Sequence, residues 1–143
     1  MSYDYKEKKI VAIIASNVPP NIMTNVIGHL AVSVGRYIDD DFMGRPILTD
    51  KSGIQHRGIS KYPFITTKVK QSKLRCAIEI AREEGLFVAD FPEQMLETGH
   101  DDELARAMAE VEEGEFSYLG AIIYGEADKV NNITGKFTLW RID

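Results

Sequence analysis

The chain has 143 residues, of which 44% are hydrophobic and 27% are charged, and its formal net charge is −5. This length allows a core that needs no disulfide, and we expect residues 1–143 to form one domain. The single cysteine, Cys76, excludes an internal disulfide. No apolar stretch has membrane-spanning length, and the residues before Lys9 are too polar for a signal peptide. We therefore expect a cytoplasmic protein that does not contact membranes.

The charge is distributed unevenly along the chain. Residues 1–78 contain twelve basic residues (Lys and Arg) and six acidic residues (Asp and Glu), which gives a net charge of +6. Residues 79–143 contain five basic and sixteen acidic residues, which gives a net charge of −11. No acidic residue lies between Asp50 and Glu79. Two interpretations of the basic stretch 51–75 remain open. In the first, it provides a local positive field that attracts a negatively charged partner such as RNA. In the second, it is a set of solvated lysines on a strand edge and a helix.

A buried strand and a long helix are expected first. Residues 9–15 form a continuous apolar run rich in β-branched residues, which is typical of a strand covered on both faces. Pro19 and Pro20 end this strand, and Pro20 fits the first turn of a helix. We expect that helix to continue to Tyr37. Its apolar face repeats every four residues, at Ile22, Val26, Leu30 and Val34.

The remaining elements alternate between strands and helices. We expect a hairpin at Pro46–Ile59, strands at Tyr62–Val69, Leu86–Asp90, Phe116–Tyr124 and Phe137–Trp140, and helices at Ser72–Glu84, Asp101–Glu113 and Glu126–Thr134. This order predicts an α/β fold with a mixed, largely parallel sheet and helices on both faces.

The first helix also carries a polar stripe. Its members are Asn25, His29, Ser33 and Arg36. Gly28 lies beside them, although glycine in a helix interior costs about 1 kcal/mol relative to alanine. Such a glycine suggests close approach by another backbone or by a ligand. We therefore expect Asn25, Gly28 and Arg36 to contribute to a ligand-binding site.

A second group of candidates follows the strand that ends at Asp90. Residues just past the carboxyl end of a parallel strand line ligand crevices, and Gln94, Thr98 and His100 lie in the loop beyond Asp90. A carboxylate can orient an imidazole for acid–base work, so His29 and Asp90 are the candidate catalytic residues. Two alternatives remain open: Asp90 is a turn or cap residue, and His29 is bonded to a carbonyl at the sheet end.

Motifs for common cofactors and metals are absent from the sequence. Val18-Pro19-Pro20 stands where a phosphate-binding loop needs free N–H groups, which argues against nucleotide binding of the Rossmann or Walker kind. The three histidines, His29, His56 and His100, lack the spacing of metal ligands, and no nucleophile elbow is present. The sequence therefore predicts no cofactor and no metal.

Five groups of residues that cover nearly the whole chain share a pattern with known proteins. They are Asn25–Ala31 after Val18-Pro19-Pro20, Gly58–Ser60 with Tyr62–Ile65, Leu86–Phe91, Met95–Gly99 and Thr134–Arg141. This pattern resembles a small bacterial domain-of-unknown-function family, the one numbered two thousand. That family is similar in fold to the type II peptidyl-tRNA hydrolases, so the resemblance implies a peptidyl-tRNA hydrolase II-like fold.

The active residues of those hydrolases are mostly missing here. The resemblance places their glycine–lysine pair, glutamine and threonine at Asn21, Ile22, Val26 and Gln94. Only their aspartate is matched, by Asp90, and residues 10–50 contain no lysine. The alkyl group of Ile22 donates nothing to a developing oxyanion, so the resemblance does not imply the hydrolase mechanism.

Three functional hypotheses follow. In the first, the protein is a non-hydrolase member of this fold that binds a small-molecule or nucleotide-containing ligand in the cleft between the first helix and Asp90. In the second, it is a divergent hydrolase or transferase in which His29 acts as acid or base, Asp90 orients it or activates water, and Asn25 positions the substrate. In the third, it is a homodimeric interaction protein that uses a strand edge or its third helix.

Overall fold

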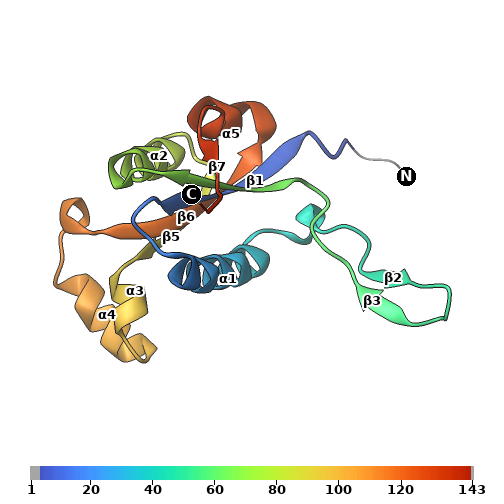
Figure 1. Cartoon of the computed structure of the whole chain (residues 1–143), viewed down its shortest axis with the longest axis horizontal. Coiled ribbons are helices and arrows are strands. Elements are labelled where there is room, and N and C mark those ends of the chain that lie inside the picture. The colour runs from blue at the N-terminus through green and yellow to red at the C-terminus, as the bar shows by residue number, and fades with distance from the viewer. Residues whose placement is uncertain (1–3, 143) are drawn as a thin grey trace.

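A five-stranded sheet with helices on both faces forms the centre of the protein (Figure 1). The structure is a computed structural model that describes residues 4–142, so residues 1–3 and 143 of the predicted domain lie outside the described residues. The strands of the sheet are β1 (Lys8–Ala15), β4 (Phe64–Val69), β5 (Phe87–Pro92), β6 (Tyr118–Glu126) and β7 (Thr138–Leu139). The helices are α1 (Pro20–Tyr37), α2 (Gln71–Glu83), α3 (Gln94–Glu97), α4 (Asp101–Ala109) and α5 (Ala127–Thr134). The strands β2 (Ile47–Thr49) and β3 (Gln55–Arg57) form a separate hairpin, as the sequence predicts.

The sheet is mixed, with the strand order β5-β6-β1-β4-β7. Strand β1 pairs in parallel with β4, and the pairings β1–β6, β4–β7 and β5–β6 are antiparallel. The expectation of a largely parallel sheet is therefore wrong. The physical reason lies in the connection between β5 and β6. It contains α3 and α4, and α4 packs on α3 instead of crossing a sheet face, so β6 returns antiparallel between β5 and β1.

Helices cover both faces of the sheet, which confirms that prediction. Helix α1 packs on one face, and α2 and α5 pack together on the other (Figure 1). The buried residues of α1 are Val26, Leu30 and Val34, whereas Ile22 is only partly buried. None of the helices in residues 4–142 combines the length and hydropathy needed to span a bilayer.

Strand β1 is the most completely buried element. Every residue from Ile10 to Ala15 is at most 1% exposed, as expected for a strand with helices on both sides. Burying one large aliphatic side chain contributes roughly 1.5–3 kcal/mol, so the isoleucines of β1 supply a substantial part of the hydrophobic stabilisation.

Strand β5 is shifted from its expected bounds. It begins at Phe87 and continues to Pro92, with an irregularity between Phe91 and Pro92, so Asp90 lies inside the strand and not at its end. Pairing with β6 extends the strand, and a sequence pattern does not report such pairing. The helix expected at Asp101–Glu113 is also shorter, because α4 ends at Ala109.

Two glycines have opposite surroundings. A Cβ added at Gly120 would lie 2.9 Å from Val26 Cγ1 and 3.1 Å from the carbonyl oxygen of Ile13, so helix α1 meets β6 closely there. A Cβ added at Gly28 meets no atom within 4 Å. The expectation that another backbone approaches Gly28 is therefore wrong, because this part of α1 is exposed.

These surroundings predict opposite effects of alanine. Gly28→Ala should raise the free energy of unfolding by about 1 kcal/mol, because it favours the helix without a clash. Gly120→Ala should lower it by about 1–3 kcal/mol, because the new methyl group overpacks the α1–β6 contact. Denaturant unfolding of both variants measures these changes. A less stable Gly28→Ala variant would contradict the open surroundings assigned to Gly28.

Candidate functional site

A cleft of about 350 Å³ lies between α1, β5 and the α3–α4 segment. Its walls are formed by His29, Leu30 and Ser33 of α1, by Asp90 and Phe91 of β5, and by Met95, Thr98, Gly99, His100, Asp101 and Leu104 beyond β5. We call it the α1–α4 cleft. Its volume lies at the lower end of the usual range for small-molecule sites. Three predicted site residues, His29, Asp90 and Thr98, border this one cleft.

The His29 imidazole has a defined hydrogen-bonding state. Its Nδ1 lies 3.0 Å from the carbonyl oxygen of Asn25, one helical turn earlier. Because a carbonyl oxygen only accepts, Nδ1 donates its proton, and the neutral ring presents Nε2 as an acceptor. The carbonyl thus belongs to the same helix and not to the sheet end. The ring also contacts Phe91, with 6.1 Å between the ring centroids.

The His100 imidazole has the opposite arrangement. His100 is the N-cap of α4, and its Nδ1 accepts the backbone N–H of Glu103 at 3.4 Å. The neutral ring therefore holds its proton on Nε2 and presents a donor. The cleft thus has one imidazole that accepts through Nε2 and one that donates through Nε2.

The Asp90 carboxylate is engaged away from His29. Its Oδ2 lies 2.6 Å from Nη2 of Arg82 in α2, and α2 covers the sheet face opposite α1. Successive side chains of a strand point to opposite faces, and Phe91 contacts His29 on the α1 side. The structure therefore does not pair the Asp90 carboxylate with the His29 imidazole.

Burial controls the charge state of Asp90. Removal from water raises the pKa of its carboxyl group, and the nearby Arg82 guanidinium opposes this rise. Arg82 also lies 3.9 Å from Glu113, whose carboxylate accepts a hydrogen bond from the Tyr118 hydroxyl at 2.8 Å. That hydrogen bond is the main reason why the pKa of Glu113 is lowered. Arg75 completes this charged network, 2.8 Å from Glu113.

The remaining predicted site residues are less well placed for a cleft ligand. Asn25, Gly28 and Arg36 are exposed on α1 outside the cleft walls. Gln94 begins α3 and also lies outside the walls, and its Oε1 is buried without a hydrogen-bond partner among the described residues. The Thr98 hydroxyl borders the cleft but donates to the carbonyl oxygen of Gln94 at 2.9 Å.

Sequence reasoning missed the partner of Asp90, and it placed His100 in the candidate loop without assigning it the N-cap position of α4. Arg82 lies eight residues before Asp90 on a different element, and no motif signals such a pair. The signal for His100 was available, because a residue just before an acidic helix start is a candidate N-cap. In residues 4–142, no three His, Cys, Asp or Glu side chains gather as metal ligands would.

The protein is thus an α/β protein with a mixed sheet and a cleft between α1, β5 and the α3–α4 segment. The chain belongs to the family described as "Protein of unknown function (DUF2000)", whose sequence pattern matches residues 8–141. This match confirms the family that the sequence resembles. No curated protein matched the chain.

A solved structure has a similar fold. The protein of unknown function Atu0240 from Agrobacterium tumefaciens strain C58 is 20% identical and superimposes with a TM-score of 0.83. The match covers 94% of this chain and 98% of that protein. At this identity the likeness shows the fold alone.

Arg82→Gln should destabilise the protein most at neutral pH. The substitution removes the cation that opposes the raised pKa of Asp90, so the ionised carboxylate stays buried without its partner. We expect a loss of about 1 kcal/mol at pH 7 that shrinks as the pH falls to about 4, because the raised pKa of Asp90 favours the protonated carboxyl group in acid. Denaturant unfolding at both pH values measures this loss. Arg106→Gln, an exposed change on α4, is the control, and equal losses for Arg82→Gln at both pH values would contradict the prediction.

Proposed function

We propose that the protein binds a small-molecule or nucleotide-containing ligand in the α1–α4 cleft, on a fold related to the type II peptidyl-tRNA hydrolases but without their activity. The observation that carries this proposal is the pair of complementary imidazoles, His29 and His100, on the walls of one cleft. The cytoplasmic location stays a prediction.

The cleft walls favour a flat ligand with two polar atoms. Phe91 and Leu104 make part of the cleft lining apolar, with Phe91 almost fully buried at its base and Leu104 half-buried. The acceptor of His29 and the donor of His100 match a group that both donates and accepts, such as a primary amide or the edge of a nucleobase. A ligand of this kind is satisfied by the two rings without a charged partner.

The enzymatic alternative receives less support. A hydrolase or transferase that uses His29 with Asp90 needs the carboxylate within reach of the imidazole, directly or through one water. The Asp90 carboxylate is bonded to Arg82 on the other side of the sheet. Ile22, at the position of the hydrolase lysine, packs against the core as an apolar residue.

Titration with benzamide and adenine tests this site. Both should shift the nuclear magnetic resonance signals of Phe91 and of the two imidazoles, and His29→Ala or His100→Asn should weaken binding about tenfold by removing one hydrogen bond. Asparagine is chosen at position 100 because it retains the N-cap of α4. The matched control is His56→Ala, since His56 pairs with Asp50 in the β2–β3 hairpin. Binding that is unchanged in both cleft variants, or no binding of either probe, would refute the proposed site.

A specific observation also supports the homodimer hypothesis as a second candidate. The β2–β3 hairpin projects from the body of the protein, and all six of its strand residues are exposed (Figure 1). A two-stranded hairpin with no covered face is marginally stable alone. We call the hairpin with its flanking residues, 45–59, the arm. It carries Arg45 and Arg57 and the exposed Ile54 and Ile59, and its arginines complement the acidic first turn of α4. We propose that the arm of one copy packs on α4 of a second copy.

Sedimentation at micromolar concentration measures this association. We expect a dimer for the unchanged chain and a monomer for the double variant Ile54→Ser with Ile59→Ser, because both apolar contacts are lost. Val32→Ser on α1 is the control, since Val32 is equally exposed but lies outside the arm. A monomeric unchanged chain would exclude the dimer.

A further inference from the structure

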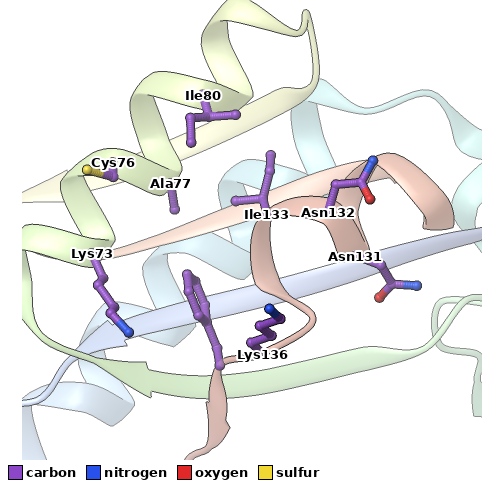
Figure 2. A pocket seen from close by; sticks show the side chains of 9 residues that line it. Lys73, Cys76, Ala77, Ile80, Asn131, Asn132, Ile133 and Lys136 are labelled. Carbon is purple, nitrogen blue, oxygen red and sulfur yellow. The ribbon is translucent and has the colours of Figure 1, made fainter.

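A second region of the molecule, on the sheet face covered by α2 and α5, contains two adjoining hollows. The first, of about 510 Å³, lies between α2 and α5 (Figure 2). The second, of about 410 Å³, lies at the ends of β1 and β4. Lys73, Lys136 and Phe137 line both hollows, so the two form one continuous depression. We call it the lysine groove.

The groove is strongly cationic. Four lysines line it, namely Lys68, Lys70, Lys73 and Lys136. Lys68 donates to the carbonyl oxygen of Arg141 at 2.8 Å, whereas in the described part of the chain the other three make no ion pair or side-chain hydrogen bond. Among residues 4–142, no Asp or Glu lines either hollow. Like charges grouped in one depression repel one another, and a bound anion would offset this repulsion.

The backbone topology places this groove at a switch point of the sheet. Strands β1 and β4 are parallel neighbours. The chain leaves β1 for α1 on one face and leaves β4 for α2 on the opposite face (Figure 1). Crevices of open α/β sheets form outside the carboxyl ends of strands at such a point. Ser16 directly follows β1 and Lys70 directly follows β4, and both line the groove.

The start of α2 adds to the positive field. The helix has 13 residues, its N-cap is Lys70, no side chain caps it, and its first turn contains no acidic residue. The partial positive charge of the helix N-terminus therefore acts beside Lys70 and Lys73, and no acidic residue of the first turn neutralises it. This field adds to that of the lysines.

The groove also has an apolar part. In Figure 2, Ala77, Ile80 and Ile133 lie between α2 and α5, and Asn131 and Asn132 lie on the α5 side. An inorganic anion alone leaves these apolar side chains uncovered. A ligand that combines an anionic group with an organic part covers both regions.

We propose that the lysine groove binds a small organic phosphate ester. The phosphate group lies among Lys70, Lys73 and Lys136, where a dianion matches the cationic cluster. The organic part lies over Ile80 and Ile133. This site is separate from the α1–α4 cleft, which lies on the other sheet face. The two proposals are therefore independent, and the failure of one does not affect the other.

Calorimetric titration with phenyl phosphate and with inorganic phosphate tests the proposal. We expect phenyl phosphate to bind more tightly than inorganic phosphate, and its affinity to fall as the salt concentration rises from about 20 to 300 mM. The double variant Lys73→Gln with Lys136→Gln should weaken phenyl phosphate binding at least about tenfold. The matched control is Lys51→Gln with Lys129→Gln, which removes the same charge from exposed residues outside the groove.

Each further outcome decides the proposal. Ile133→Ser should weaken phenyl phosphate binding but leave inorganic phosphate binding unchanged, and His29→Ala should change neither. Equal affinities in the groove variant and its control, or no binding of phenyl phosphate at millimolar concentration, would overturn the site. Equal binding of the two phosphates would overturn the organic part. A single-stranded RNA oligonucleotide that binds more tightly than phenyl phosphate and is lost in the groove variant would assign the groove to nucleic acid instead.

Discussion

The burial of β1 between two layers of helices is the constraint on which the other features depend. Because Ile10–Ala15 has almost no exposed surface, both faces of this strand must be covered, by α1 on one side and by α2 and α5 on the other. The strand is also held at both edges, in parallel by β4 and antiparallel by β6. A polar side chain in the centre of this strand would lose solvation on either face, which explains its continuous run of apolar residues.

This central layer separates two regions of different chemistry. The α1 side holds the cleft with the hydrogen-bonded imidazoles of His29 and His100. The α2–α5 side holds the cationic groove around Lys73 and Lys136. Two adjacent residues of β5 illustrate this separation. Phe91 contacts His29 on the α1 side, whereas the Asp90 carboxylate pairs with Arg82 on the α2 side. Two residues that are adjacent in the sequence can therefore belong to different regions.

Much of the fold follows from the sequence, and the failures have a common cause. The apolar run of β1, the four-residue repeat of α1 and the turn of the β2–β3 hairpin are local signals, and the structure confirms each of them. Strand direction and the partner of Asp90 depend on which distant segments meet. The insertion of β6 between β1 and β5 leaves no mark in periodicity, because periodicity reports which face is buried and not what covers it. The site was therefore only partly predictable: His29, Asp90 and Thr98 meet at one cleft, whereas Gly28 and Arg36 do not.

The basic stretch 51–75 shows how the fold divides a linear charge pattern. Lys61 is paired with Asp41 at 3.0 Å, and Arg75 is paired with Glu113, so part of the positive charge is neutralised locally. Lys51 lies on the projecting hairpin, away from the rest. Lys68, Lys70 and Lys73 lie at the end of β4 and the start of α2, and the turn after α5 adds Lys136 from the acidic half of the chain. The cationic groove is thus a product of the β1–β4 switch point and the α2–α5 contact, because the sequence alone places Lys68, Lys70 and Lys73 together but not Lys136.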